Sequence, residues 1–338
     1  MPEQPTAAIV VGSASGDISV SVGNRLTTRV RWLLTRWPVR WGFLAATIGL
    51  CLYTVAREWN SVRIAIAGIG VVPILAALVA ALVAMLAAMR SWRTLLAALG
   101  SPLPIRAAAG IVFVGQLGKY LPGSVWPVLA QMELANAHQV PRHRSATASV
   151  LAMLMSLFAG LLAALVTLPF VLTAPPYRLL LLAVPVMLLC LHPKVLNPAL
   201  RLLLRLARRA DSYEPLGGRA VLVALGWALL SWLAYGLQIW LLAVRLGAPE
   251  GRTALLAVGG FALAWSVGFV VVLAPAGAGV RDVLLVAILG TVLGVADATA
   301  VALVSRLLMT AGDLLAAAVA AFLARQRRSN ATEQAKGL

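Results

Sequence analysis

The sequence predicts an all-α, polytopic integral membrane protein, and three observations support this prediction. The chain of 338 residues is 61% hydrophobic and only 12% charged, whereas a soluble domain carries roughly 25% charged residues. Its apolar residues fall in long runs, and a run of about 20 residues crosses the hydrocarbon core as a helix. The net charge of +17 comes from basic residues gathered between these runs, as in cytoplasmic loops. Lipid is therefore the expected solvent of most of the chain.

The ends of the chain differ from its apolar middle. Residues 1–24 have scattered glycines and no sustained hydrophobic period, so we expect a disordered N-terminal tail and not a signal peptide. Residues 25–40 combine five arginines with tryptophans, which is typical of a basic segment at the membrane interface. Residues 325–338 are basic and polar and are expected to form a C-terminal tail.

Eight apolar runs between these ends are predicted to be membrane spans. They lie at residues 39–55, 64–89, 145–172, 178–191, 220–244, 253–273, 279–293 and 298–324. The membrane domain, 41–324, is expected to form two pseudo-repeated halves, 41–192 and 220–324. Between them, residues 193–219 carry leucines at helical spacing among basic residues, which predicts a cytoplasmic amphipathic linker.

The distribution of basic residues predicts the orientation of the chain. Twenty of the 28 Lys and Arg residues fall in segments assigned to the cytoplasmic side, and five fall on the opposite side. This excess indicates that both termini are cytoplasmic and that the number of crossings is even. We therefore expect a multi-pass protein of the cell (cytoplasmic) membrane.

Two apolar segments are interrupted by helix breakers, one in each half. Residues 115–127 contain Gly115, Gly118, Pro122 and Gly123, and residues 273–282 contain Pro275, Gly277 and Gly279. Irregular backbone at membrane depth is tolerated where it faces protein or a wet cavity, and in transporters such paired interruptions mark the substrate site. We expect residues 107–137 to form a re-entrant hairpin that enters and leaves on one side. Ordinary tight turns between short spans are the alternative.

Charged residues lie beside each interruption, and ionisable groups within a membrane are costly enough to indicate function. Lys119 is expected to contact a lipid phosphate or to extend to the interface. Glu133 pairs with Lys119 or with an arginine of the second half, or it faces the cytoplasmic edge. Arg281 suits a phosphate because guanidinium binds it in a bidentate manner, and Asp282 either joins it or caps a helix.

The last span adds Arg306 and Asp313, which lie two helical turns apart. That spacing is too long for a direct pair on one helix, so each is expected to find a partner on another helix, or both line one cavity. The expected lipid-binding residues are Lys119, Tyr120, Pro122, Gly123, Glu133, Pro275, Gly277, Gly279, Arg281, Asp282, Arg306 and Asp313.

The motif Gly-Gln-Leu-Gly-Lys-Tyr-Leu-Pro-Gly-Ser-Val-Trp at 115–126 resembles the lysylphosphatidylglycerol synthase transmembrane-region family. Residues 275–282, which end in Arg281 and Asp282, resemble its Pro-Gly-Gly-x-Gly-x-Arg-Glu element, and the resemblance covers nearly all of 40–325. The chain departs from the family at 124–127, where Arg-x-Gly-Glu is common, and at Asp282, where Glu is more usual. The resemblance implies the flippase half of enzymes that make aminoacylated phosphatidylglycerol. Other relatives accompany glycosyltransferases that use polyprenyl-linked sugars, so the lipid stays open.

We therefore expect a flippase-like protein that binds and translocates a phospholipid or a polyprenyl-linked lipid. A membrane-embedded glycosyl or aminoacyl transferase component, or a non-transporting partner subunit of a lipid-modifying enzyme, is the alternative. No catalytic motif is recognisable, so an enzyme is not expected. Neither a cofactor nor a nucleic-acid partner is expected, and the three histidines lack the spacing of a metal site.

Overall fold

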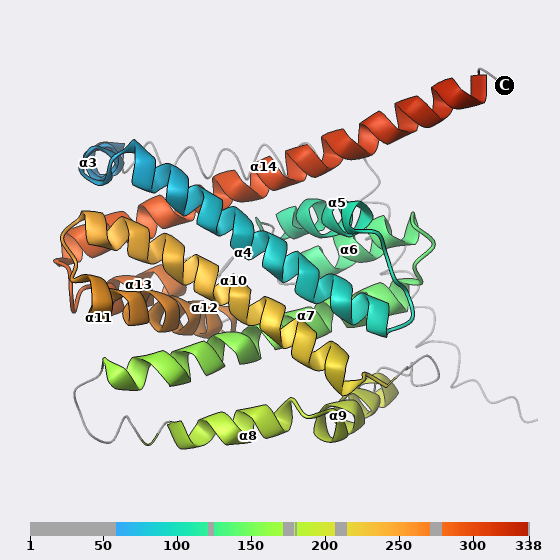
Figure 1. Ribbon diagram of the computed structural model, residues 1–338, viewed down its shortest axis with the longest axis horizontal. Coiled ribbons are helices and arrows are strands. Elements are labelled where there is room, and N and C mark those ends of the chain that lie inside the picture. Colours follow the sequence, from blue (N-terminus) through green and yellow to red (C-terminus); the bar gives the residue numbers. More distant parts are fainter. Residues whose placement is uncertain are drawn as a thin grey trace, which may run out of the picture. The chain divides into compact units, whose positions relative to one another are not determined.

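Figure 1 shows a computed structural model of the chain as a bundle of helices. It describes residues 59–120, 125–171, 179, 181–206, 215–270 and 279–336. These residues all lie within one compact unit, Glu58–Leu338, and every regular element among them is a helix. The protein is therefore all-helical over this part of the chain, as predicted. The predicted tail at 1–24, the interfacial segment at 25–40 and the first span at 39–55 lie outside the described residues.

Five helices are long and apolar enough to cross a membrane. They are Val71–Ala98, Arg142–Phe170, Gly218–Arg245, Glu250–Phe269 and Val295–Leu323. They coincide with the spans expected at 64–89, 145–172, 220–244, 253–273 and 298–324. The prediction of a multi-pass helical membrane protein is confirmed at this level, and the count of eight crossings stays a prediction.

Helices α4 (Val71–Ala98) and α10 (Gly218–Arg245) form the central pair of the bundle (Figure 1). Each has 28 residues, which corresponds to about 42 Å at the α-helical rise. Small side chains on both helices are buried and allow the close approach typical of membrane helices. The Ser91 hydroxyl of α4 donates a hydrogen bond to the carbonyl oxygen of Ala224 in α10 at 2.9 Å.

Three further long elements surround this pair. Helix α7 (Arg142–Thr167) packs against both α4 and α10. The chain from α11 (Glu250–Leu255) through a π-helical turn to α12 (Phe261–Val270) packs against α7 and α10. Helix α14 (Val295–Lys336) contacts α4, α5, α10 and α13, so it touches elements from both halves of the sequence.

The second expected span differs from the structure in two ways. Gly70 separates α3 (Trp59–Ile69) from α4 because its φ of 85° is not helical. Glycine adopts such a positive φ more readily than other residues. Helix α4 also continues past the expected end at residue 89 and includes Arg90 and Arg93. Their charges are accommodated on the helix, since Arg90 lies 5.3 Å from the Trp227 ring centroid and Arg93 Nε donates to the Leu103 carbonyl at 2.7 Å.

Two of the expected spans contain only short helices. Helix α8 (Ala183–Cys190) has 8 residues and α13 (Val280–Leu289) has 10. At the α-helical rise these lengths are about 12 Å and 15 Å, well below the roughly 30 Å of hydrocarbon. The apolar run at 279–293 is longer than α13 because it includes the turn between α13 and α14. In the linker, α9 (Pro193–Leu206) is held by Asn197, which exchanges hydrogen bonds with the backbone of Leu216.

The first interrupted segment is a hairpin of two short helices. Helix α5 (Ile105–Gln116) continues into a 3-10 turn, η1 (Leu117–Tyr120), and α6 (Trp126–Asn136) packs back against α5. A Cβ on Gly115 would lie 2.6 Å from Gln131 Cγ, and one on Gly118 would lie 2.9 Å from Pro127 N. These glycines therefore serve close packing at the place where the α-helix ends at Gln116 and the 3-10 turn begins.

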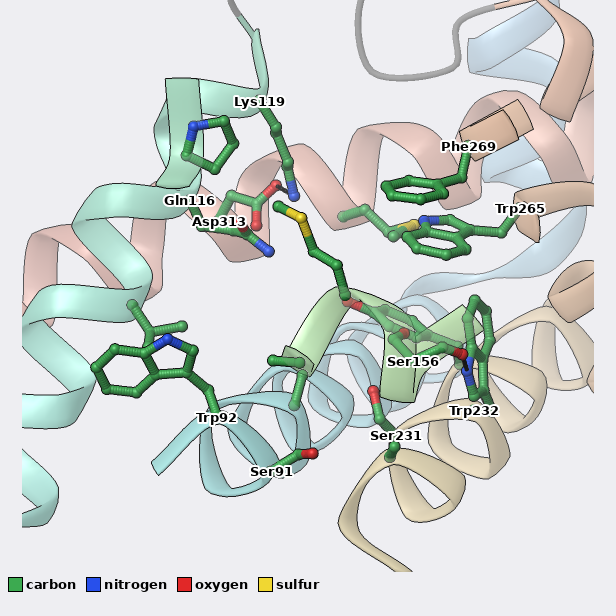
Figure 2. A pocket seen from close by; sticks show the side chains of 18 of the residues that line it. Ser91, Trp92, Gln116, Lys119, Ser156, Ser231, Trp232, Trp265, Phe269 and Asp313 are labelled. Carbon is green, nitrogen blue, oxygen red and sulfur yellow. Dashed lines mark hydrogen bonds and ion pairs between the residues drawn. The ribbon is translucent and has the colours of Figure 1, made fainter. Parts of the chain in front are cut away.

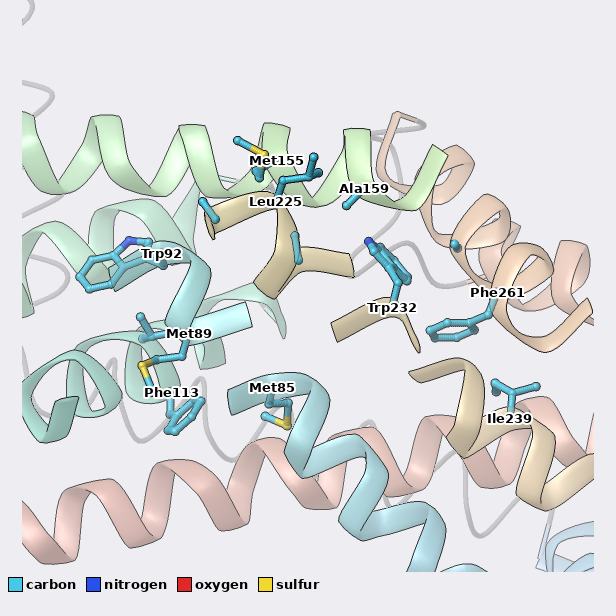
Figure 3. Packing of buried hydrophobic residues seen from close by; sticks show 14 of the residues in the cluster. Met85, Met89, Trp92, Phe113, Met155, Ala159, Leu225, Trp232, Ile239 and Phe261 are labelled. Carbon is cyan, nitrogen blue, oxygen red and sulfur yellow. The ribbon is translucent and has the colours of Figure 1, made fainter. Parts of the chain in front are cut away.

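The second interrupted segment has a similar arrangement. Helices α12 and α13 pack together, and a Cβ on Gly268 would lie 3.2 Å from the Arg281 Cβ. The apolar core runs between these hairpins and the central pair. Figure 3 shows its larger members, among them Met89, Trp92, Phe113, Trp232 and Phe261. The core fixes the positions of the helices whose polar residues face the cavity described below.

Candidate functional site

A cavity of about 290 Å³ lies inside the bundle, and charged and neutral polar side chains interrupt its largely apolar lining. Its walls come from α4, α5, η1, α6, α7, α10, α12, α13 and α14, so both interrupted segments contribute to it. Figure 2 shows Lys119 and Asp313 facing one another on one wall and Trp265 and Phe269 on the other side. The cavity is therefore the place where the two halves of the sequence meet around polar groups.

The first charged group of the cavity joins η1 to α14. Lys119 Nζ lies 2.5 Å from Asp313 Oδ2, and the Tyr120 hydroxyl donates to the same oxygen at 2.6 Å. The Asp313 side chain is 3% exposed, whereas that of Lys119 is 28% exposed. Burying a carboxylate is strongly unfavourable unless a cation and hydrogen bonds compensate it. Lys119 and Tyr120 provide this compensation, so Asp313 holds η1 against α14.

The second charged group joins α13 to α14. Arg306 Nη1 donates to Asp282 Oδ2 at 2.7 Å, while Arg281 Nε lies 3.7 Å from Asp282 Oδ1. The backbone N–H of Gly279 also donates to Asp282 Oδ2, at 3.3 Å. Gly279 has φ of 97°, so this turn into the helix depends on glycine. Asp282 in the first turn is further stabilised by the α13 dipole.

Arg281 has a less polar environment than the other two cations. Its guanidinium carbon lies 5.3 Å from the Phe261 ring centroid, within cation–π range. Nη2 lies 3.8 Å from the Met309 sulfur. The side chain is 13% exposed, and within the described residues its guanidinium has no hydrogen bond to an oxygen acceptor. Arg281 therefore retains donor capacity beside the cavity.

The remaining walls are aromatic and neutral polar. Trp92 Nε1 donates to Ser149 Oγ at 3.0 Å, and Ser149 Oγ donates to Gln131 Oε1 at 2.5 Å. Trp232 Nε1 donates to the Ser156 carbonyl at 2.9 Å. The Trp265 and Phe269 rings are stacked, with centroids 5.1 Å apart. Neutral side chains that also line the cavity are Gln116, Ser156, Ser231, Tyr235 and Thr310.

The structure brings together half of the residues that the sequence pointed to. Six of the expected twelve line the cavity: Lys119, Tyr120, Arg281, Asp282, Arg306 and Asp313. Gly279 is not among the lining residues, but its N–H supports Asp282. The other expected positions at the interruptions, Pro122, Gly123, Pro275 and Gly277, lie outside the described residues. Arg306 and Asp313 both find partners on other elements, as expected from their spacing.

Glu133 lies outside the cavity, and its role in lipid binding stays a prediction. It is not a lining residue, and its side chain is 38% exposed. Its carboxylate forms a bidentate pair with Arg142, at 3.1 and 3.0 Å, on the first turn of α7. The pair closes the α6–α7 connection. The expected pairing with Lys119 does not form because Asp313 takes that role.

Sequence reasoning named Tyr120 but missed the tryptophans, Phe269 and the neutral polar residues of the cavity. Single tryptophans and serines in apolar helices carry no distinctive pattern. One signal was available, since Ser149 and Ser156 lie seven residues apart and therefore on one face of the same helix. Small polar residues on one face of an apolar helix indicate either helix contacts or a wet cavity.

Charge is the property that best characterises the site. Three cations, Lys119, Arg281 and Arg306, and two carboxylates, Asp282 and Asp313, line the cavity, which gives it one excess positive charge. The apolar helices around the site strengthen such an excess, because a charge is screened less beside apolar groups than in water. The arrangement is therefore suited to holding an anion.

Comparisons with known proteins provide one match. Neither the curated proteins nor the solved structures include a significant match to the chain. The family model described as "Lysylphosphatidylglycerol synthase TM region" matches residues 39–317, a range that contains every residue lining the cavity. The chain therefore belongs to the lysylphosphatidylglycerol synthase transmembrane-region family.

Proposed function

We propose that the protein is a flippase-like integral membrane protein that binds a phosphate-bearing lipid and moves it across the cytoplasmic membrane. The observation that supports this best is the cavity itself. It lies within an apolar bundle and has three cations against two carboxylates. Its lipid can be a phospholipid or a polyprenyl-linked lipid, since both carry phosphate. Membership of the family is consistent with a role in lipid handling.

The proposed path keeps the acyl chains in the bilayer while the headgroup enters the cavity. Lys119 on η1 and Arg281 on α13 lie on separate hairpins, and both hairpins contact α14. A phosphate in the cavity forms charge-assisted hydrogen bonds with Arg281. Movement of the hairpins against α14 then opens the cavity to one side of the membrane at a time, as in transporters with interrupted helices.

The proposed topology has eight crossings in two pseudo-repeated halves, a re-entrant hairpin at 107–137 and both termini in the cytoplasm. Accessibility to a membrane-impermeant thiol reagent in intact cells tests it, in a background with Cys51 and Cys190 replaced by alanine. Glu250 and Lys194 are exposed and are assigned to opposite sides. We expect labelling of Glu250→Cys and no labelling of Lys194→Cys until the cells are opened. The reverse pattern would show that the orientation is wrong.

Lipid retention and lipid transfer test the function directly. Lipids extracted from the purified protein are identified by mass spectrometry, and transfer of a fluorescent phospholipid is measured in proteoliposomes by dithionite quenching. Lys119→Ala and Arg281→Ala are expected to reduce both signals. Lys194→Ala and Arg142→Ala are matched controls away from the cavity and should behave like the wild type. If both cavity variants retain the same lipids at wild-type occupancy, the site assignment is wrong.

We also propose that the protein acts by binding or transport and not as an enzyme. A lipid-modifying enzyme is the proposed protein partner, because family relatives accompany such enzymes. The same proteoliposomes, given a lipid-linked donor, separate these possibilities. Product formation would indicate a transferase, and lipid binding without transfer would indicate a non-transporting partner subunit.

A further inference from the structure

We infer that the cavity selects a lipid whose headgroup is anionic and otherwise uncharged, and that it discriminates against an aminoacylated, cationic headgroup. The inference rests on the proposed function and narrows its substrate class. The relevant chemistry is a phosphodiester attached to a neutral, hydroxyl-bearing group. The charge pairing, the position of Arg281 and the neutral walls each contribute one step.

First, the carboxylates of the cavity are already neutralised by the protein. Asp313 Oδ2 has Lys119 Nζ at 2.5 Å and the Tyr120 hydroxyl at 2.6 Å. Asp282 has Arg306 Nη1 at 2.7 Å and Arg281 Nε at 3.7 Å. A cationic ammonium on the headgroup would have to compete with these cations for Asp282 or Asp313. In the described part of the cavity, no other carboxylate is available to it.

Second, the cavity has one more cation than it has carboxylates. Asp282 lies between two arginines, and the shorter of its contacts is with Arg306. Arg281 is held by the Phe261 ring and by the Met309 sulfur, neither of which neutralises its charge. A guanidinium in this state is suited to a phosphate because two N–H groups can bind two oxygens at once.

Third, the neutral walls fit a hydroxyl-bearing group. Gln116, Ser231 and Tyr235 line the cavity, and among the described residues their side chains have no hydrogen-bonding partner within the protein. Each offers a donor or an acceptor without charge. The ring of Phe261 already holds the guanidinium of Arg281, and that of Tyr120 lies 5.5 Å from Lys119 Nζ. These two rings therefore face the protein's own cations, and among the rings that line the cavity Trp265 and Phe269 stack on each other.

Two lipid classes share the selected chemistry. A glycerophospholipid such as phosphatidylglycerol carries its phosphodiester on glycerol, and a polyprenyl-phosphate sugar carries its phosphate on a neutral hexose. Aminoacylation of phosphatidylglycerol with lysine adds two positive charges to the same headgroup. Phosphatidylglycerol and its lysyl ester therefore form a matched pair that differs in charge within the cavity.

Competition for the full-length protein in nanodiscs tests the inference. Displacement of radiolabelled phosphatidylglycerol is measured with unlabelled phosphatidylglycerol, lysylphosphatidylglycerol and a decaprenyl-phosphate hexose. We expect phosphatidylglycerol to compete at least about tenfold better than its lysyl ester, the effect of one charge-assisted contact. The relative strength of the decaprenyl-phosphate hexose then shows which of the two anionic classes is preferred.

Variants connect the selectivity to Arg281. Arg281→Gln is expected to weaken the binding of phosphatidylglycerol at least about tenfold and to remove most of the discrimination between phosphatidylglycerol and its lysyl ester. Arg281→Lys keeps the charge and should retain part of the discrimination. Arg142→Gln, outside the cavity, should change neither. Each variant is first compared with the wild type in thermal unfolding, so that a folding defect is recognised.

The possible outcomes separate this inference from the function on which it rests. If the wild type binds none of the three lipids above the level of empty nanodiscs, the proposed function fails. If it binds lipids but prefers lysylphosphatidylglycerol, or if Arg281→Gln keeps the full discrimination while folded, only the charge selectivity is overturned.

Discussion

The two interrupted segments use the same architecture for different charge arrangements. In the first, the short helices α5 and α6 pack closely through Gly115 and Gly118, and in the second the short helix α13 packs on the longer helix Glu250–Phe269 at Gly268. Each presents a cation to the cavity, and α14 supplies a charged partner to both. The partner differs in sign: Asp313 meets Lys119 on the first hairpin, whereas Arg306 meets Asp282 on the second.

This difference indicates a division of labour. At the first hairpin, Lys119 neutralises the buried carboxylate of Asp313, which suits a structural connection to α14. The second hairpin keeps one positive charge in excess, which suits ligand binding at Arg281. Position on α14 decides which role each hairpin takes, since Arg306 and Asp313 are separated by two helical turns. The comparison predicts that the first region dominates stability and the second dominates lipid affinity.

The largest effect on stability is expected for Asp313→Ala. Lys119 would remain in a partly buried site without its carboxylate, which costs about 2–4 kcal/mol of unfolding free energy. Unfolding in an SDS titration measures the change. Asp282→Ala is the matched variant of the second region, and its effect should be smaller because its side chain is 24% exposed against 3% for Asp313. Equal losses would remove the proposed difference between the two regions.

An intermediate effect is expected where the hairpins pack through glycine. Gly118→Ala places a Cβ 2.9 Å from backbone atoms of Trp126 and Pro127, and such overpacking costs about 1–3 kcal/mol. Gly268→Ala meets the Arg281 Cβ at 3.2 Å and should cost less. Gly110→Ala is the control, because a Cβ there has no neighbour within 4 Å. Thermal unfolding of the three variants ranks them. If Gly110→Ala is also destabilised, the losses in the other two variants cannot be assigned to close packing.

The smallest effect is expected for Tyr120→Phe. The substitution removes one hydrogen bond to Asp313 but leaves the ion pair with Lys119 in place, so the loss should be about 1.5 kcal/mol. The same SDS titration detects it. In the Asp313→Ala background, Tyr120→Phe should have a smaller further effect, since this acceptor is already absent. Full additivity would show that the Tyr120 hydroxyl contributes through another contact.

The helical membrane class was predictable because it follows from local composition. Long apolar runs with few charges predicted the positions of five helices that match in the structure. The errors came where length alone was used, as at 279–293, where α13 ends after 10 residues. A turn made of Gly, Thr and Val is as hydrophobic as the helix before it, so hydropathy could not show where the helix ends.

The charged half of the cavity was also predictable, and its neutral half was not. Lys119, Arg281 and Asp313 were predicted as site residues because a charge within an apolar run is costly. Trp265 and Ser231 have ordinary roles in most membrane helices, and only their position beside the cavity distinguishes them. Glu133 met the same criterion of a charge near an interruption, but the structure pairs it with Arg142 outside the cavity.

The sequence by itself determined that the chain is an all-helical membrane protein, that two segments are interrupted, and that charged residues accompany them. Composition and spacing act locally, so they suffice for these properties. Only the tertiary structure decided which charges pair, because Lys119 and Asp313 are almost 200 residues apart and meet only when η1 packs on α14. The excess positive charge of the cavity follows from which charged side chains the fold brings into its lining.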